Sequence, residues 1–283
     1  MIYRIKWVVF LAVAVMVASA SAQVTQENNP ELNRISVEEH LGDTIPLGLT
    51  FTNENGAPVT LGSFFRDGRP VVLVLGYYEC PMLCNLVFNG LVDGIRPLSL
   101  LPEKDFQIVA VSINPKETPD LAAAKKVNYL KNLGKEIDPS GWEFLVGQQD
   151  QIEPLAAAVG FKYFYDEERD QYAHPAVVFV LTPQGVISRY LYGIEFNNND
   201  LKLSLLEASR GQLGSTVDKL ILYCFHYDPD AKGYVVVAGN VMKLGGLATM
   251  LALGVFVSFL WLGERRKKHR ATQEAVKHKA EVR

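Results

Sequence analysis

The chain has 283 residues and is 48% hydrophobic, which is enough for one ordinary domain with accessory segments. Its formal net charge of −3 hides an uneven distribution, because residues 263–283 carry eight Lys or Arg against three Asp or Glu. The rest of the chain is therefore acidic, so we do not expect nucleic acid as a partner. Three cysteines cannot all pair with one another, which excludes a disulfide scaffold.

The N-terminal residues have the pattern of an export signal. Two basic residues precede a short apolar run over 7–22, and the run ends in Ala20-Ser21-Ala22. This combination is typical of a signal peptide, so we expect residues 1–22 to be cleaved. An uncleaved anchor is the alternative, although the run is shorter than the ~20 residues that span a bilayer. The polar residues 23–42 then form a linker.

Residues 43–215 alternate between strand and helix patterns. The apolar runs at 71–78 and 106–113 are typical of strands buried on both faces. The expected elements, in chain order, are a strand over 45–52, a turn at Asn55-Gly56 with a return over 58–61, a helical turn over 61–65, a strand over 71–78, a helix over 83–95, a strand over 106–113, a helix from the N-cap Thr118 to Gly134, a strand over 142–146, a helix over 149–159, strands over 175–181 and 186–192, and a helix capped by Asn199 or Asp200 that ends near Gln212. This order predicts an α/β domain, a mixed sheet flanked by helices.

The C-terminal residues predict a membrane anchor. Two short apolar runs within 216–242 indicate a juxtamembrane β-hairpin. An uncharged run follows that is long enough to cross a bilayer, so we assign a transmembrane helix to residues 243–263. The basic tail at 264–283 indicates the cytoplasmic side, which a buried core helix would not explain. Together with the export signal, this places the domain in the periplasm and the chain in the cell inner membrane.

Cys80 and Cys84 lie where the strand over 71–78 gives way to a helix. A helix N-terminus stabilises a thiolate, and a spacing of four residues places both sulfurs on one face. Such a pair can form a disulfide or bind one metal ion, for which soft thiolates favour Cu(I) with Zn(II) as competitor. A purely structural disulfide is the third reading. The thioredoxin-type redox motif has one residue fewer between its cysteines.

Two histidines are candidates for a further ligand. His174 stands before Pro175 and the strand over 175–181, although a lone histidine is more often a surface residue. Cys224, His226 and Asp228 alternate along a predicted strand and would share a face. For this second cluster we favour the simpler interpretation, a buried cysteine beside a surface histidine.

Three motifs, in this order, resemble the SCO/SenC family. They are Gly76-Tyr77-Tyr78-Glu79-Cys80-Pro81-Met82-Leu83-Cys84, Val111-Ser112-Ile113-Asn114-Pro115-Lys116-Glu117-Thr118-Pro119, and Tyr172-Ala173-His174-Pro175 with Leu181-Thr182-Pro183-Gln184-Gly185. The resemblance covers roughly residues 43–212. It implies a thioredoxin fold and a copper site with Cys80, Cys84 and His174 as ligands. We expect Cu(I) at this site, and binding of Cu(II) as well is left open.

The sequence departs from the family pattern at three points. Asn85 stands where the family usually has Pro, and Met82 where it often has Asp. Most members carry an N-terminal anchor, whereas the anchor predicted here is C-terminal. These differences leave the three ligands in place, but they bear on the partner and on the affinity for metal.

The resemblance implies two functions that use the same residues. The first is a membrane-anchored copper-binding protein that assists assembly of the copper centre of cytochrome c oxidase, with the copper-binding subunit of the oxidase and a periplasmic copper chaperone as partners. The second is a thiol–disulfide oxidoreductase acting on cysteines of the oxidase or of a chaperone, in which Cys80 attacks and Cys84 resolves. A peroxidase of the peroxiredoxin kind is a third candidate, but it does not need two cysteines one helical turn apart.

Overall fold

The structure is a computed structural model that describes residues 34–80, 83–209, 225–228, 233–236 and 238–281. The predicted signal peptide, Pro81, Met82 and Cys224 lie outside these residues. The elements before the C-terminal segment are β1 (Thr50–Thr52), β2 (Pro58–Thr60), η3 (Leu61–Phe64), β3 (Val71–Gly76), α2 (Leu83–Ile95), β4 (Gln107–Ser112), α3 (Pro119–Leu133), η4 (Pro139–Gly141), β5 (Trp142–Leu145), α4 (Gln149–Ala158), β6 (Phe164–Asp166), β7 (Gln171–Ala173), β8 (Val177–Leu181), β9 (Ile187–Tyr192) and α5 (Asn198–Ala208).

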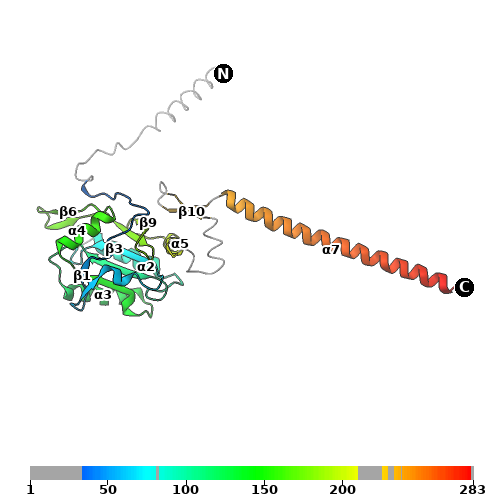
Figure 1. Ribbon diagram of the computed structural model, residues 1–283, viewed down its shortest axis with the longest axis horizontal. Coiled ribbons are helices and arrows are strands. Elements are labelled where there is room, and N and C mark those ends of the chain that lie inside the picture. Colours follow the sequence, from blue (N-terminus) through cyan, green and yellow to red (C-terminus); the bar gives the residue numbers. More distant parts are fainter. Residues whose placement is uncertain (1–33, 81–82, 210–224, 229–232, 237, 282–283) are drawn as a thin grey trace, which may run out of the picture.

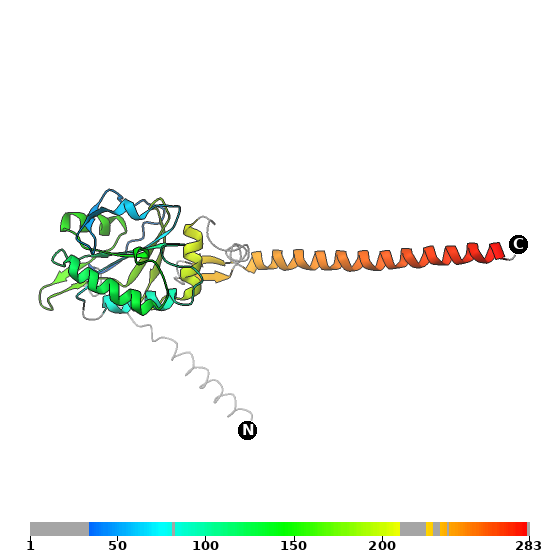
Figure 2. The ribbon, with the colours of Figure 1, turned by 90° about the horizontal axis from the view of Figure 1, so that it is seen from below.

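The core of the domain is a five-stranded sheet in the order β5-β4-β3-β8-β9. Figure 1 labels its strands β3 and β9. β3 is parallel to β4, and β4 to β5, whereas β8 pairs with β3 and β9 in the antiparallel sense. Every residue of β3, β4 and β8 is buried, as the continuous apolar runs predicted. Helix α2 packs against α3 and α5 on one side of the sheet, and α4 covers the other (Figure 2). The predicted thioredoxin-like mixed sheet is confirmed.

The topology brings three segments to one edge of the sheet. Because β3 and β4 are parallel, the residues that follow Gly76 and Ser112 leave the sheet on the same side. β8 runs antiparallel to β3, so the residues before Val177 arrive at that same edge. The first two motifs and the Tyr172–Pro175 part of the third therefore meet there, whereas Leu181 pairs with Val71 at the opposite end of the sheet.

Local signals in the sequence explain where several elements begin and end. Thr118 caps α3 by accepting a hydrogen bond from the Leu121 N–H, Pro119 occupies the first turn, and Gly134 ends the helix with a φ of 64°. Asn55-Gly56 lies in the turn that joins β1 and β2, as predicted.

Three details differ from the sequence-based expectation. The strand predicted over 45–52 is a strand only at Thr50–Thr52, because the chain turns over 46–49, where the Leu49 N–H donates to the Pro46 carbonyl. The N-cap of α5 is Asn197, which accepts from the Asn199 N–H, so a cap at Asn199 or Asp200 is wrong. The four polar residues 197–200 all suit a cap, and only the course of the chain leaving β9 selects among them. The hairpin of β6 and β7 was not predicted, because its short strands mix aromatic and charged residues without regular alternation.

The C-terminal segment begins with the hairpin of β10 (Phe225–Asp228) and β11 (Gly233–Val236). The predicted hairpin is thus present, and it is attached to α5. The Tyr234 N–H donates to the Asp200 carboxylate at 3.2 Å, and the Tyr234 hydroxyl donates to Glu207 at 2.5 Å.

Helix α7 (Ala238–Glu281) is 44 residues long and projects away from the domain (Figures 1 and 2). Within the described residues, one helix is long and apolar enough to cross a membrane, over Gly239–Phe259, and it is not covered by the domain. α7 begins before the predicted residue 243 and continues through the basic tail. The Glu, Arg, Lys and Ala residues of the tail are strong helix formers, which accounts for this continuation.

Candidate metal centre

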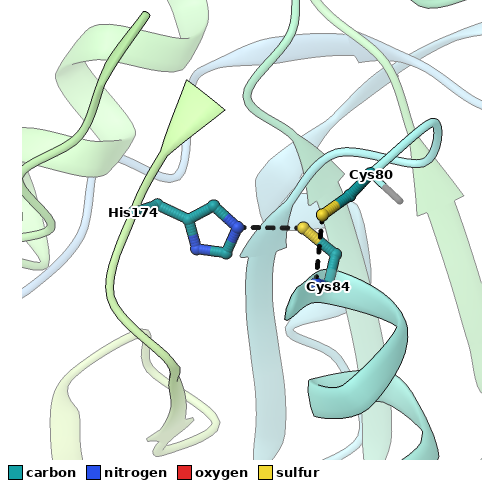
Figure 3. A group of neighbouring side chains, drawn as sticks. All are labelled: Cys80, Cys84 and His174. Atoms are coloured by element: carbon teal, nitrogen blue, oxygen red, sulfur yellow. Dashed lines mark hydrogen bonds between the residues drawn. The ribbon is translucent and has the colours of Figure 1, made fainter. Parts of the chain in front are cut away.

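Cys80, Cys84 and His174 converge at the edge of the sheet described above (Figure 3). Their ligand atoms, two Sγ and one imidazole nitrogen, all lie within 4.8 Å of one another. The residues are 6%, 2% and 4% exposed, respectively, so the group is nearly closed to solvent. The three residues that the resemblance names as ligands are therefore brought together from two segments of the chain, residues 80–84 and the residues before β8.

Cys84 lies in the first turn of α2, directly against the end of β3. Its Sγ accepts a hydrogen bond from the Tyr77 N–H at 3.3 Å, and its own N–H donates to Cys80 Sγ at 3.3 Å. A Cβ atom at Gly76 would lie 3.2 Å from Cys84 Sγ, so the absence of a side chain there makes room for the sulfur. Cys80 Sγ takes the place of a backbone carbonyl as acceptor for the Cys84 N–H, as a capping side chain does.

The protonation of His174 follows from its neighbours. Its Nδ1 lies 2.9 Å from the Pro175 carbonyl oxygen, which can only accept, so Nδ1 carries the proton. In the neutral ring Nε2 then has a free lone pair, and this atom lies 2.9 Å from Cys84 Sγ. Phe161 and Tyr77 hold the ring, with centroid distances of 5.7 and 6.1 Å. The imidazole thus presents a ligand nitrogen to the two sulfurs.

Burial controls the charge of Cys84. The loss of solvent raises the pKa of this thiol well above its usual range, and the neighbouring Cys80 raises it further. Burial thus favours the neutral thiol, and because His174 carries its proton on Nδ1, a protonated Cys84 donates its S–H to Nε2. A metal ion bound here would displace that proton, so metal binding would release protons and weaken as pH falls.

A buried carboxylate supports the loop that carries Cys80. Glu117 is 7% exposed, and it accepts hydrogen bonds from the N–H groups of Tyr78 at 2.9 Å and Glu79 at 2.8 Å. The Ser112 hydroxyl donates to the same carboxylate at 2.6 Å. Glu117 lies within the second motif, but the sequence did not reveal its role. The meeting of parallel strand ends at one edge was the signal that could have done so.

A cleft of about 530 Å³ opens beside the candidate metal centre. The ring of Tyr77 lines both the cleft and the site, and it packs edge-on against Tyr172 at 5.7 Å. Lys116, Arg169 and Glu79 add charges of both signs to the walls. The buried ligands are thus separated from an open polar cleft by aromatic rings.

The sequence profile of the family described as SCO1/SenC matches residues 42–204, which is more than half of the chain. The chain belongs to the SCO1/SenC family. No curated protein sequence matches it.

Solved structures with the same fold include two proteins of Aquifex aeolicus. A putative electron transfer protein is 27% identical with a TM-score of 0.53, covering 60% of this chain and 95% of that one. A putative electron transport protein is 26% identical with a TM-score of 0.50, covering 61% and 99%. The copper-bound ScoI of Arabidopsis thaliana is 21% identical with a TM-score of 0.45, covering 58% and 99%. The family match thus covers the domain that holds the candidate site.

Proposed function

We propose that this protein binds copper through Cys80, Cys84 and His174 and assists assembly of the copper centre of cytochrome c oxidase. The observation that carries the proposal is the buried group of two sulfurs and one imidazole nitrogen within 4.8 Å. Two thiolates and an imidazole form a soft donor set, which suits Cu(I), and the imidazole also serves Cu(II). Membership of the SCO1/SenC family supports the link to oxidase assembly.

The proposed partners are the copper-binding subunit of the oxidase and a periplasmic copper chaperone. The apolar helix over Gly239–Phe259 would hold the protein in the inner membrane, with the domain in the periplasm and the basic tail in the cytoplasm. Copper is the cargo in this proposal, and the cleft lined by Tyr77 and Tyr172 is the side from which a partner would approach.

A specific contact also supports the second candidate, a thiol–disulfide oxidoreductase. The Cys84 N–H donates to Cys80 Sγ, so the two side chains are adjacent in the reduced state. Cys80, the less buried of the two, would attack a partner's disulfide and form a mixed disulfide while the partner's first thiolate leaves. Cys84 would then attack Cys80 Sγ, release the second thiolate and leave a Cys80–Cys84 disulfide. The partner is reduced by two electrons and this protein is oxidised by two.

His174 separates the two functions experimentally. A three-ligand copper site loses a whole ligand in His174→Ala, so the affinity for Cu(I) should fall at least tenfold, about 1.4 kcal/mol or more. Disulfide exchange needs only the cysteines, so it should slow without stopping. Cys80→Ser and Cys84→Ser should lose both properties.

The measurement is a Cu(I) titration of the full-length protein against a chromogenic chelator, beside a dithiol titration of the same variants. His40→Ala is the matched control, because His40 lies on the N-terminal arm, with Nδ1 3.0 Å from the Ala158 carbonyl oxygen. If His174→Ala binds Cu(I) as tightly as the parent, the ligand assignment is wrong and the reductase function is favoured.

A further inference from the structure

Asn85, one residue after Cys84, links the Cys80 peptide to a neighbouring helix. Its Nδ2–H donates to the Cys80 carbonyl at 2.8 Å. Its Oδ1 accepts from Lys125 Nζ and from the Tyr129 hydroxyl, each at 3.1 Å. The reverse orientation of the amide would set its NH₂ against an ammonium group and its oxygen against a carbonyl, so these neighbours fix the orientation.

We propose that Asn85 is a positioning residue that holds Cys80 in the separated, reduced arrangement in which both sulfurs can share a metal ion. The part of this proposal that concerns metal binding rests on the proposed function. Asn85 stands where the family usually has Pro, which has no side-chain donor. The contact is therefore not part of that usual pattern, and its partners Lys125 and Tyr129 lie outside the three family motifs.

The need for such a contact follows from how α2 begins. The Cys84 N–H, which could bond the carbonyl four residues earlier in a regular helix, donates to Cys80 Sγ instead. The Cys80 carbonyl accepts a hydrogen bond from the Asn85 side chain at 2.8 Å. The Cys80 N–H donates to the Tyr77 carbonyl at 3.4 Å, which is a longer and weaker hydrogen bond. Of these contacts, the one from Asn85 restrains the Cys80 backbone more strongly.

The far end of the link is rigid. Tyr129 is 5% exposed, and its ring lies against Phe88 and Trp142 with centroid distances of 5.0 and 5.7 Å. Burial raises the pKa of Tyr129 to about 12, so its hydroxyl keeps the proton that it donates. Lys125 lies one turn earlier on α3 and adds a charged donor, which polarises the amide and strengthens its bond to Cys80. Asn85 thus anchors Cys80 to the aromatic core.

This arrangement has a predictable effect on the thiol pair. Oxidation joins the two sulfurs at about 2.05 Å, removes two protons and two electrons, and draws Cys80 toward Cys84. A contact that holds Cys80 in the reduced arrangement opposes that movement and favours the dithiol. The same contact pre-organises the two sulfurs for a metal ion, so its loss should weaken metal binding as well.

The test compares the full-length parent with Asn85→Ala and Lys125→Met. The first readout is the dithiol–disulfide equilibrium in glutathione buffers, in which oxidised glutathione accepts the two electrons. Asn85→Ala should shift it about three- to tenfold toward the disulfide, and a tenfold shift corresponds to about −30 mV in reduction potential. Lys125→Met keeps the length of the side chain and should shift the equilibrium less, in the same direction. Cu(I) affinity, from the chelator titration, should fall by a similar factor in Asn85→Ala.

Asn89→Ala is the matched control, since Asn89 is an exposed residue one turn further along α2. It should leave both readouts at the parent value. No shift in Asn85→Ala, a shift toward the dithiol, or an equal shift in Asn89→Ala would each overturn the proposal. Lys125→Met reports on the same link if Asn85→Ala fails to fold. The glutathione readout uses no metal, so it tests Asn85 even if the parent binds no copper.

Discussion

The carboxylate of Glu117 accepts a hydrogen bond from the Tyr78 N–H at 2.9 Å, across 39 positions of sequence. This contact and the one from the Glu79 N–H join the loop after β3 to the loop after β4, and the Ser112 hydroxyl at the end of β4 donates to the same carboxylate. Glu117 therefore holds the two residues before Cys80, and Asn85 holds the carbonyl of Cys80 itself.

Glu117→Gln should destabilise the domain. An amide keeps one acceptor oxygen but turns an NH₂ toward a backbone or hydroxyl donor, so at least one buried hydrogen bond is lost. The expected cost is about 1–3 kcal/mol in the free energy of unfolding. Denaturant unfolding of the full-length protein measures it, with Glu153→Gln on the exposed face of α4 as a control that should stay within about 0.5 kcal/mol. Equal midpoints for Glu117→Gln and the parent would contradict the anchoring role.

Glu143 should make stability depend on pH. Burial raises the pKa of Glu143 to about 7, and the neighbouring Glu54 raises it as well, whereas the Lys126 ammonium that both carboxyl groups share lowers it. The three side chains are only 9–13% exposed. Burial also opposes the ionisation of Glu54, but hydrogen bonds to Lys126 and to its own backbone outweigh this and lower the pKa.

Glu143 makes the free energy of unfolding fall as pH rises, because its pKa is higher in the folded protein than in the unfolded chain. The unfolded group ionises near 4.5, whereas the folded group keeps its proton up to about 7. Its contribution to stability is therefore complete below pH 4.5 and is lost as pH rises to 7, at up to about 1.4 kcal/mol per pH unit. Glu143→Gln has no proton to lose, so unfolding curves between pH 4.5 and 7 should show a smaller decline than in the parent. The same decline in both proteins would contradict the assignment.

The sequence predicted the fold more completely than the site. Buried parallel strands are recognisable as continuous apolar runs, and caps such as Thr118 and Gly134 mark helix ends locally. The β6–β7 hairpin carries neither signal. In the site, the spacing of Cys80 and Cys84 indicated a shared face, whereas His174 came from the family resemblance. Glu117 and Asn85 act through contacts between distant segments, which no local pattern records.

The two ends of α7 should lie on opposite sides of a membrane. This prediction rests on the apolar residues of Gly239–Phe259 and the basic cluster that follows them. In a bacterial host, a green fluorescent protein fused after Arg283 should fluoresce, and alkaline phosphatase at the same point should be inactive. Protease added to spheroplasts should degrade the domain over 34–209. A fluorescent tail together with a domain that resists the added protease would contradict the proposed orientation.

The second cysteine–histidine cluster should be dispensable for copper. Cys224 lies outside the described residues, and β10, which contains His226, pairs with the strand that Tyr234 attaches to α5. The three proposed ligands instead come from the residues before and within α2 and before β8. Cys224→Ser and His226→Ala should therefore leave the copper stoichiometry of the full-length protein unchanged. Loss of bound copper in either variant would make this segment part of the site.

Gly90 should not tolerate even a methyl group, although helix propensity argues the other way. Alanine is favoured over glycine inside a helix by about 1 kcal/mol, so propensity alone predicts that Gly90→Ala stabilises α2. A Cβ atom at Gly90, however, would lie 2.0 Å from the Ile194 carbonyl oxygen, which is backbone and cannot rotate aside.

Overpacking of this kind costs about 1–3 kcal/mol, or more where backbone must move, so the contact should outweigh the propensity. Gly94, one turn later, provides a graded comparison, because its Cβ would lie 2.9 Å from the Phe196 carbonyl oxygen. We expect the free energy of unfolding to fall in both variants, and further in Gly90→Ala than in Gly94→Ala. If Gly90→Ala were instead more stable than the parent, the segment over 194–196 would not press on α2 as closely as described.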